Sequence, residues 1–110
     1  MRLEKWIRIL NMWYAIISED REDSLAARMA TREAHLSRAK ELVHDGRLLI
    51  GGPHPSIDSE DPGTAGFSGS LLVVDFPSLD EAKAWAESDP YVTAGVYQRV
   101  TVKPFKLVLP

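Results

Sequence analysis

Apolar residues along the chain fall into short runs and longer helical patterns, which predict four strands and two helices. The compact apolar run Trp13–Glu19 predicts the first strand, because aromatic and β-branched residues favour extended structure. Asp23 or Ser24 can cap the helix that follows, which we expect to end near Val43. Gly46 lies just past that end, where a left-handed residue commonly closes a helix.

Glycine and proline separate the remaining elements. We expect a strand at Arg47–Gly52, a long polar loop at Pro53–Gly66, a strand at Phe67–Phe76, a short helix at Leu79–Glu87, a connector at Tyr91–Val96 and a last strand at Tyr97–Leu109. Asp89-Pro90 ends the short helix, because the residue before a proline disfavours helical geometry. Pro104 places its part of the last strand at an edge or at a bulge.

The order β-α-β-β-α-β predicts an α+β fold of the ferredoxin-like type, in which an antiparallel sheet carries both helices on one face. No further element is left to cover the other face of the sheet. A second copy packed sheet against sheet would cover it, so we expect a homodimer, the arrangement called a dimeric α/β barrel. The strands at Trp13–Glu19 and Phe67–Phe76 would lie at the centre of that interface.

Composition narrows the classes of function. The 110 residues suffice for one domain, and a net charge of −3 with interspersed signs gives no electrostatic footprint for nucleic acid or for an anionic membrane. No apolar run approaches the roughly 18 residues that span a bilayer. The absence of cysteine excludes a disulfide framework and thiolate metal ligands, and it favours a cytoplasmic location.

Residues 1–11 (MRLEKWIRILN) stand apart from the rest of the pattern. Arg8 breaks their apolar stretch and no small-residue cleavage site follows, so we reject a signal peptide. Met12 directly precedes the first expected strand. Two alternatives remain: an N-terminal extension ahead of a domain that spans residues 12–110, or a short amphipathic arm packed on the surface.

The candidate chemistry begins on the first helix. Four apolar residues form a stripe on the helical wheel that we expect to face the core: Leu25, Met29, Leu36 and Val43. Arg32 falls near the centre of this stripe, where a charge needs a partner or a ligand unless its stem reaches out to solvent. His35 lies one turn later at the flank of the stripe, where it borders both core and cleft.

His35 alone is as well explained by packing or by a surface position as by chemistry. Asp89 favours a chemical role for His35, because Asp89 ends the second helix and both helices lie on the same face of the expected sheet. An aspartate can hold a histidine in one tautomer and make it a usable base, and an arginine beside it suits an anionic or enolate-like oxygen. We therefore predict that His35 hydrogen-bonds Asp89 and that Arg32 lines the same pocket.

The long loop Pro53–Gly66 is the second unusual feature, because loops of that length are often lids or binding loops. Its acidic residues lack the spacing of an EF-hand, which favours a solvated acidic loop over a calcium site. The three histidines, His35, His44 and His54, lack the spacing of a zinc motif, and no glycine motif for phosphate or dinucleotide is present. We expect no metal and no cofactor.

Several stretches together resemble the YciI (YCII-related) family: WYAIISED, TREAHLSRAKELVHDGRLLIGGPHP, SIDSEDPGTAGFSGSLLVVDF, SLDEAKAWAESDPYVTAGVY and VTVKPFKLVLP. The resemblance runs from about residue 12 to the end. It implies a dimeric α/β barrel related to small ring-modifying isomerases and monooxygenases, and a His–Asp site. The matching positions are His35 in the R-x-x-H-L run and Asp89 in D-P-Y. The candidate substrate-binding residues are Arg32, Ser70, Tyr91 and His54.

Three functions remain open, since some relatives are linked to dehydrochlorination of a chlorinated hydroxyquinol but the fold does not fix a reaction. In a cofactor-free lyase or isomerase, His35 would abstract a proton from a small ring or enolisable substrate, Asp89 would orient it, and Arg32 would bind the developing oxyanion. The alternative is a non-catalytic module that binds a small anionic metabolite in the same cleft. The third is a purely structural dimer. The first two imply a small-molecule ligand.

Overall fold

A computed structural model of the chain describes residues 11–110. The two alternatives for the N-terminal segment concern residues that lie, except for Asn11, outside the described part. The boundary of the domain at residue 12 therefore stays a prediction.

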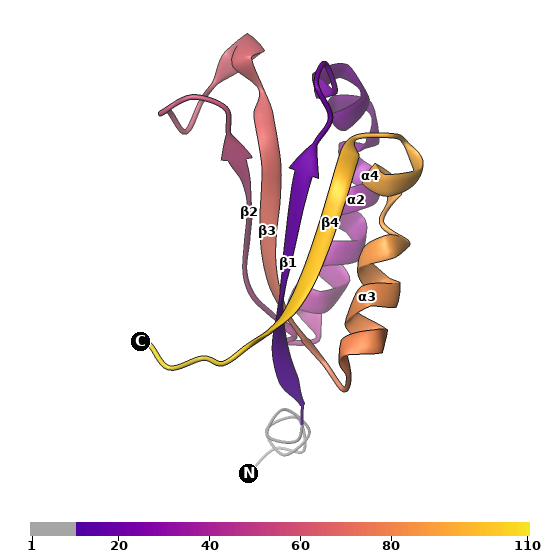
Figure 1. The fold of residues 1–110 in the computed structure, drawn as a ribbon, viewed down its shortest axis with the longest axis vertical. Helices are drawn as coiled ribbons and strands as arrows, with labels where there is room; N and C mark the ends of the chain where they lie inside the picture. Colours follow the sequence, from indigo (N-terminus) through magenta and orange to yellow (C-terminus); the bar gives the residue numbers. More distant parts are fainter. Residues whose placement is uncertain (1–10) are drawn as a thin grey trace.

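The described chain forms one four-stranded sheet with its helices on one face (Figure 1). The elements are β1 (Met12–Asp20), α2 (Leu25–His44), β2 (Leu48–Pro55), the short 3-10 helix η1 (Gly63–Ala65), β3 (Phe67–Phe76), α3 (Leu79–Glu87), α4 (Pro90–Thr93) and β4 (Tyr97–Phe105). The strand order is β2-β3-β1-β4, and each neighbouring pair is antiparallel. The predicted ferredoxin-like α+β fold is confirmed.

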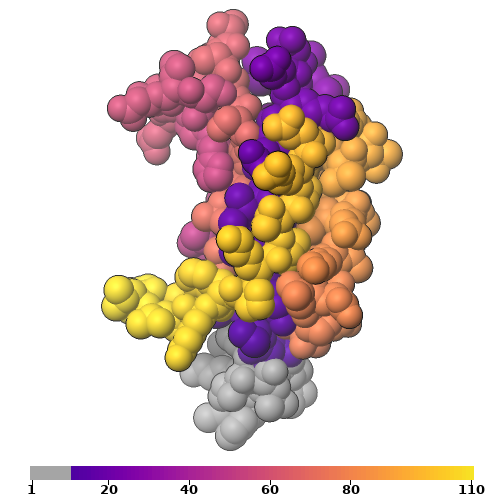
Figure 2. All heavy atoms as spheres, viewed as in Figure 1, coloured from indigo at the N-terminus to yellow at the C-terminus, as the bar shows by residue number. Residues whose placement is uncertain are grey.

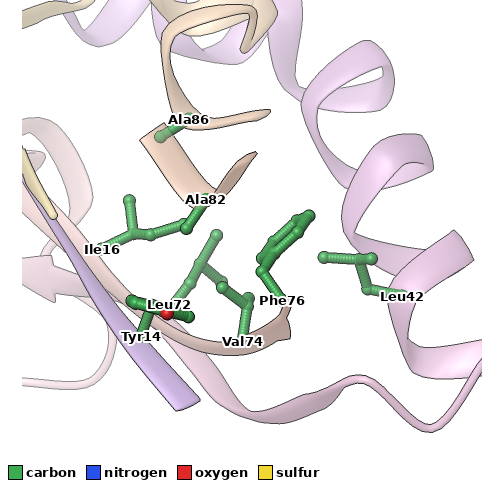
Figure 3. Close-up of a cluster of buried hydrophobic side chains, with 8 residues drawn as sticks. All are labelled: Tyr14, Ile16, Leu42, Leu72, Val74, Phe76, Ala82 and Ala86. Carbon is green, nitrogen blue, oxygen red and sulfur yellow. The ribbon is translucent and has the colours of Figure 1, made fainter. Parts of the chain in front are cut away.

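The main hydrophobic core fills the space between the sheet and the two longer helices. Its buried members are Tyr14, Ile16, Leu42, Leu72, Val74, Phe76, Ala82 and Ala86 (Figure 3). Val74 and Ala82 have no exposed surface, so the short side chains of α3 let that helix approach the sheet closely. Burying a side chain such as that of Val74 or Ile16 stabilises the fold by about 1.5–3 kcal/mol.

The face of α2 that packs on the sheet differs from the predicted one. The structure buries Arg28, His35, Ala39 and Leu42. By contrast, Met29 and Val43 are 68% and 57% exposed, and Arg32 is exposed as well. The buried face is rotated by roughly 80° from the predicted stripe, at about 100° per residue. The prediction failed because two of the four buried residues are polar, and apolar periodicity carries no signal for them.

Strand β2 is longer than predicted and the following loop is shorter. The strand continues through Pro53 and Pro55, and Pro53 lies opposite Ser70 of β3. Prolines are tolerated here because β2 is an edge strand with an unpaired side. The irregular segment between β2 and β3 is therefore limited to residues 56–66, which include η1.

The last strand also lies at an edge, as Pro104 predicted, and it ends at Phe105 rather than at Leu109. The remaining residues form a tail that stands away from the body of the molecule (Figures 1 and 2). Leu107, Val108 and Leu109 of this tail are 40%, 71% and 80% exposed. An apolar segment of this kind is unusual on the surface of an isolated domain.

The face of the sheet away from the helices carries a row of apolar residues. Along β1 it presents Trp13, Ala15 and Ile17, and the register places Val73 opposite Ala15 and Leu71 opposite Ile17. No described helix covers this face (Figure 1). The row suits packing against a second sheet, and the homodimer stays a prediction.

None of the helices within residues 11–110 is both long enough and apolar enough to cross a membrane. The cytoplasmic location inferred from the composition stays a prediction.

Candidate functional site

Asp89 is held in place by its own backbone surroundings, between α3 and α4. It precedes Pro90, and its φ of −62° and ψ of 133° are extended, as expected for a residue before proline. One carboxylate oxygen, Oδ1, accepts a hydrogen bond from the Tyr91 backbone N–H at 2.9 Å and so caps α4. Its side chain is therefore oriented by the D-P-Y sequence itself.

The other oxygen of Asp89 contacts His35 of α2. The distance from His35 Nδ1 to Asp89 Oδ2 is 2.8 Å, and both residues are buried. An ionised carboxylate can only accept, so Nδ1 is the donor of this hydrogen bond, and in the neutral imidazole Nε2 then keeps a free lone pair. Within the described residues Nε2 makes no hydrogen bond. The predicted hydrogen bond between the two side chains is present, and their catalytic role stays a prediction.

Two tyrosines fix the plane of the His35 ring. Tyr91 stacks on it, with ring centroids 4.0 Å apart and planes inclined by 10°. Tyr97 meets both rings edge-on, at 6.5 Å from His35 and 5.4 Å from Tyr91. Burial raises the pKa of the Tyr91 phenol, although the charges of Arg28 and Arg32 oppose this. Tyr91 is therefore a neutral, apolar-faced support for the imidazole at neutral pH.

A buried ion pair, which the sequence reasoning missed, lies next to this stack. Arg28 donates from Nε to Asp20 Oδ2 at 2.8 Å and from Nη2 to Asp20 Oδ1 at 2.9 Å. Burial lowers the pKa of Arg28, but the hydrogen bond and charge of Asp20 outweigh it and raise that pKa above its ordinary value. The signal was available, because Arg28 is seven residues before His35 and so shares its face within about 20°.

A pair of buried hydroxyl groups completes the polar cluster. Ser70 Oγ of β3 lies 2.8 Å from the Tyr97 hydroxyl of β4, across β1, which lies between these two strands. Burial raises the pKa of Tyr97 to about 12, and its hydrogen bonds with Ser70 and Ser18 only partly offset that rise. The Tyr97 hydroxyl therefore keeps its proton at neutral pH and can donate to Ser70.

A cavity of about 280 Å³ between α2 and β2 brings these groups together. Its polar lining consists of Arg28, Arg32, His35, Lys40, Ser70 and Tyr91. Leu36, Val43 and Leu72 supply an apolar wall, and Gly51 keeps room beside it, since a Cβ there would lie 2.6 Å from the end of the Leu72 side chain. The cavity thus offers an apolar wall with polar and charged groups around it.

The structure brings four of the predicted site residues to this cavity, namely Arg32, His35, Ser70 and Tyr91. Asp89 does not line the cavity and is linked to its lining through the hydrogen bond to His35. His54 is not brought there. Strand β2 continues through it, and the alternation of strand side chains turns Pro53 to the cavity and His54 to the opposite face of the sheet.

Two other observations concern the described residues as a whole. A larger, more open hollow of about 980 Å³ lies near Arg47, Phe76 and Trp85, away from the His35–Asp89 pair. Within residues 11–110 no three histidine, aspartate or glutamate side chains are grouped as ligands for a metal ion.

Comparisons with known proteins show which proteins this chain resembles. The sequence model of one protein family, described as the YCII-related domain, matches residues 12–106. The "Protein YciI" of Escherichia coli O6:H1 is 55% identical over 97 residues, which cover 88% of this chain and 99% of that protein. "Derivative of benzaldehyde biosynthesis cluster protein C" of Emericella nidulans is 34% identical over 96 residues, which cover 83% of this chain and 94% of that protein.

One solved structure is also similar to this chain. It is the 5-chloro-2-hydroxyhydroquinone dehydrochlorinase TftG of Burkholderia phenoliruptrix AC1100, in complex with 2,5-dihydroxybenzoquinone. It matches with a TM-score of 0.76 and 28% sequence identity, over 86% of this chain and 94% of that one.

Proposed function

Because the chain belongs to the YCII-related domain family, we propose that it is a small enzyme that removes a proton from a hydroxylated ring compound without a cofactor. The observation that carries the proposal is the buried hydrogen bond between His35 Nδ1 and Asp89 at the wall of a cavity. The match to TftG supports the choice of a ring compound, since that protein is a dehydrochlorinase with a dihydroxybenzoquinone bound.

The proposed chemistry starts at the free nitrogen of His35. A ring hydroxyl gives its proton to Nε2, and the Asp89 carboxylate stabilises the imidazolium that forms. The imidazolium then returns the proton to a ring carbon, which leaves a C=O bond and gives the keto tautomer. If that carbon carries an anionic leaving group, loss of the anion together with the proton of a second hydroxyl completes an elimination. No oxidant or reductant enters either sequence.

The rest of the cavity suits such a ligand. Its apolar wall can pack against the face of a ring, while Arg32 and Lys40 at the mouth favour an anion over a neutral molecule. Arg32 is exposed and has no hydrogen-bond partner among the described residues, so it is free to meet an incoming ligand. In this proposal Arg32 draws the ligand in and His35 performs the proton transfer.

Two measurements test the proposal. Binding of 2,5-dihydroxybenzoquinone is followed by its visible absorbance, and turnover is followed by chloride release from 5-chloro-2-hydroxyhydroquinone. We expect the wild type to bind and turn over, and His35→Ala and Asp89→Asn to lose turnover by at least 100-fold, the order that general base catalysis contributes. His44→Ala is the matched control, because His44 is an exposed histidine at the end of the same helix and does not line the cavity.

The outcomes separate the proposed enzyme from the non-catalytic binding module. Tight binding with no chloride release by the wild type would favour the non-catalytic binding module for this class of ligand. Loss of turnover in His44→Ala to the same extent as in His35→Ala would contradict the assigned base. A thermal-shift screen of small hydroxylated ring compounds on the wild type and on His35→Ala extends the test to other substrates of this class.

A further inference from the structure

The cavity contains a second group of polar side chains, separate from the His35–Asp89 pair. Arg28 lines the cavity, yet its Nε and Nη2 are committed to Asp20, and Nη2 also donates to the Gly69 carbonyl at 3.4 Å. Within the described residues its third nitrogen, Nη1, makes no hydrogen bond. A buried guanidinium with one uncommitted N–H₂ group beside a cavity is a donor for a ligand.

Ser70 lines the same cavity as this guanidinium. The carbonyl that Arg28 contacts belongs to Gly69, the residue before Ser70, so the two cavity-lining donors are neighbours. Tyr97 lies 2.8 Å from the Ser70 hydroxyl and keeps its own proton at neutral pH, so it can donate to Ser70. Ser70 is then left with its hydroxyl proton free for an oxygen atom in the cavity.

Both donors are fixed before any ligand arrives. Asp20 holds two of the three guanidinium nitrogens, and the rings of Tyr91 and Phe67 lie 4.9 and 5.4 Å from its central carbon. A Cβ at Gly69 would collide with the Ser18 carbonyl, so this glycine lets β3 run close against β1. Donors held in this way stabilise a negative charge without reorganisation, which is the property of an oxyanion-binding site.

We propose that Arg28 and Ser70 form a two-donor subsite for an anionic ring oxygen, and that the ligand class is a small planar ring with at least two oxygen substituents. This inference rests on the proposed function, because the second oxygen is the one whose proton passes to His35. It reassigns the oxyanion-binding role that the sequence suggested for Arg32, which is exposed at the mouth of the cavity.

The test compares two probes of the same ring, 2,5-dihydroxybenzoquinone and 2,5-dimethoxy-1,4-benzoquinone. The first carries ionisable oxygens and the second does not. We expect the wild type to bind the dihydroxy probe at least tenfold more tightly, and Ser70→Ala and Arg28→Lys each to reduce that preference by about tenfold. Arg99→Ala is the matched control, since Arg99 is exposed, forms an ion pair with Glu19 and does not line the cavity.

The result separates this inference from the proposed function. An unchanged preference in both Ser70→Ala and Arg28→Lys would overturn the subsite, even if His35→Ala still abolishes turnover and the proposed function stands. A wild type that does not bind the dihydroxy probe would overturn both. If Arg28→Lys fails to fold, Ser70→Ala decides alone, because it deletes a single hydroxyl oxygen and keeps the Asp20–Arg28 pair intact.

Discussion

Removal of either member of the buried Asp20–Arg28 pair should destabilise the fold strongly, and removal of both should cost less than the sum of the two single losses. The two side chains are 2% and 8% exposed, so neither can regain water easily once its partner is gone. Asp20→Ala would leave a buried guanidinium without its counter-charge, and Arg28→Met would leave a buried carboxylate without its donors.

The structure sets the size of the effect. Two charge-assisted hydrogen bonds join the pair, at 2.8 and 2.9 Å, and each contributes about 1.5–3 kcal/mol. The independent estimate for breaking one side of a buried ion pair is about 3–5 kcal/mol. We therefore expect each single variant to lose about 4 kcal/mol of unfolding free energy. The double variant Asp20→Ala/Arg28→Met should lose less than the sum of the two by at least about 2 kcal/mol.

Equilibrium urea unfolding, followed by tryptophan fluorescence, measures these values, since Trp13 and Trp85 lie in the described domain. The control is the same cycle on Glu19 and Arg99, which form an exposed contact at 3.4 Å. We expect its coupling to be below about 1 kcal/mol. Additive losses at Asp20 and Arg28, or single losses no larger than those of the control, would show that the buried pair does not hold this end of the fold together.

Three further predictions concern the assembly and the stability of the chain. Ile17→Lys should convert a homodimer to a monomer in sedimentation velocity, and a monomeric wild type at micromolar concentration would contradict the sheet-on-sheet interface. Deletion of residues 1–11 should leave cooperative thermal unfolding intact, and its loss would show that this segment is part of the domain. Since burial raises the pKa of Tyr97 from 10.0 to about 12, the folded state holds a proton that the unfolded state has lost between these values. The unfolding free energy should therefore keep this contribution below pH 10 and lose about 2 kcal/mol of it by pH 12 relative to Tyr97→Phe, and equal falls in both proteins would refute this.

Most of the fold could be predicted because each element carries a local signal. The bounds of β3 and α3 agree with the predicted ones, since Phe67–Phe76 contains the apolar run Leu71–Val74 and Ser78 caps α3 through the Glu81 N–H. The predicted second strand ended at Gly52, because a proline such as Pro53 normally ends a strand. Only the sheet order, which places β2 at an edge, explains why the strand continues through it.

The His35–Asp89 contact could be predicted because it depends only on the topology and on a proline. Two helices on one face of a sheet bring Asp89 near α2, and Pro90 fixes its backbone. Arg28 and Asp20 could not be found in this way, because the wheel was oriented by apolar residues. The buried face of α2 is set by what its polar residues meet, and those partners lie 8 and 54 residues away along the chain.

The buried face of α2 has an apolar half and a polar half along its length. The apolar half packs in the core and the polar half lies at the site. Toward its C-terminus Ala39 and Leu42 are buried, and Leu42 packs in the main apolar core (Figure 3). Toward its N-terminus Arg28 and His35 meet charged and aromatic partners instead. Burying these polar groups costs free energy unless every one has a hydrogen-bond partner. The apolar half of α2 therefore stabilises its packing on the sheet, while the polar half carries the site residues. Because one rigid helix carries both halves, the packing of Leu42 also sets the position of the His35 ring over the cavity.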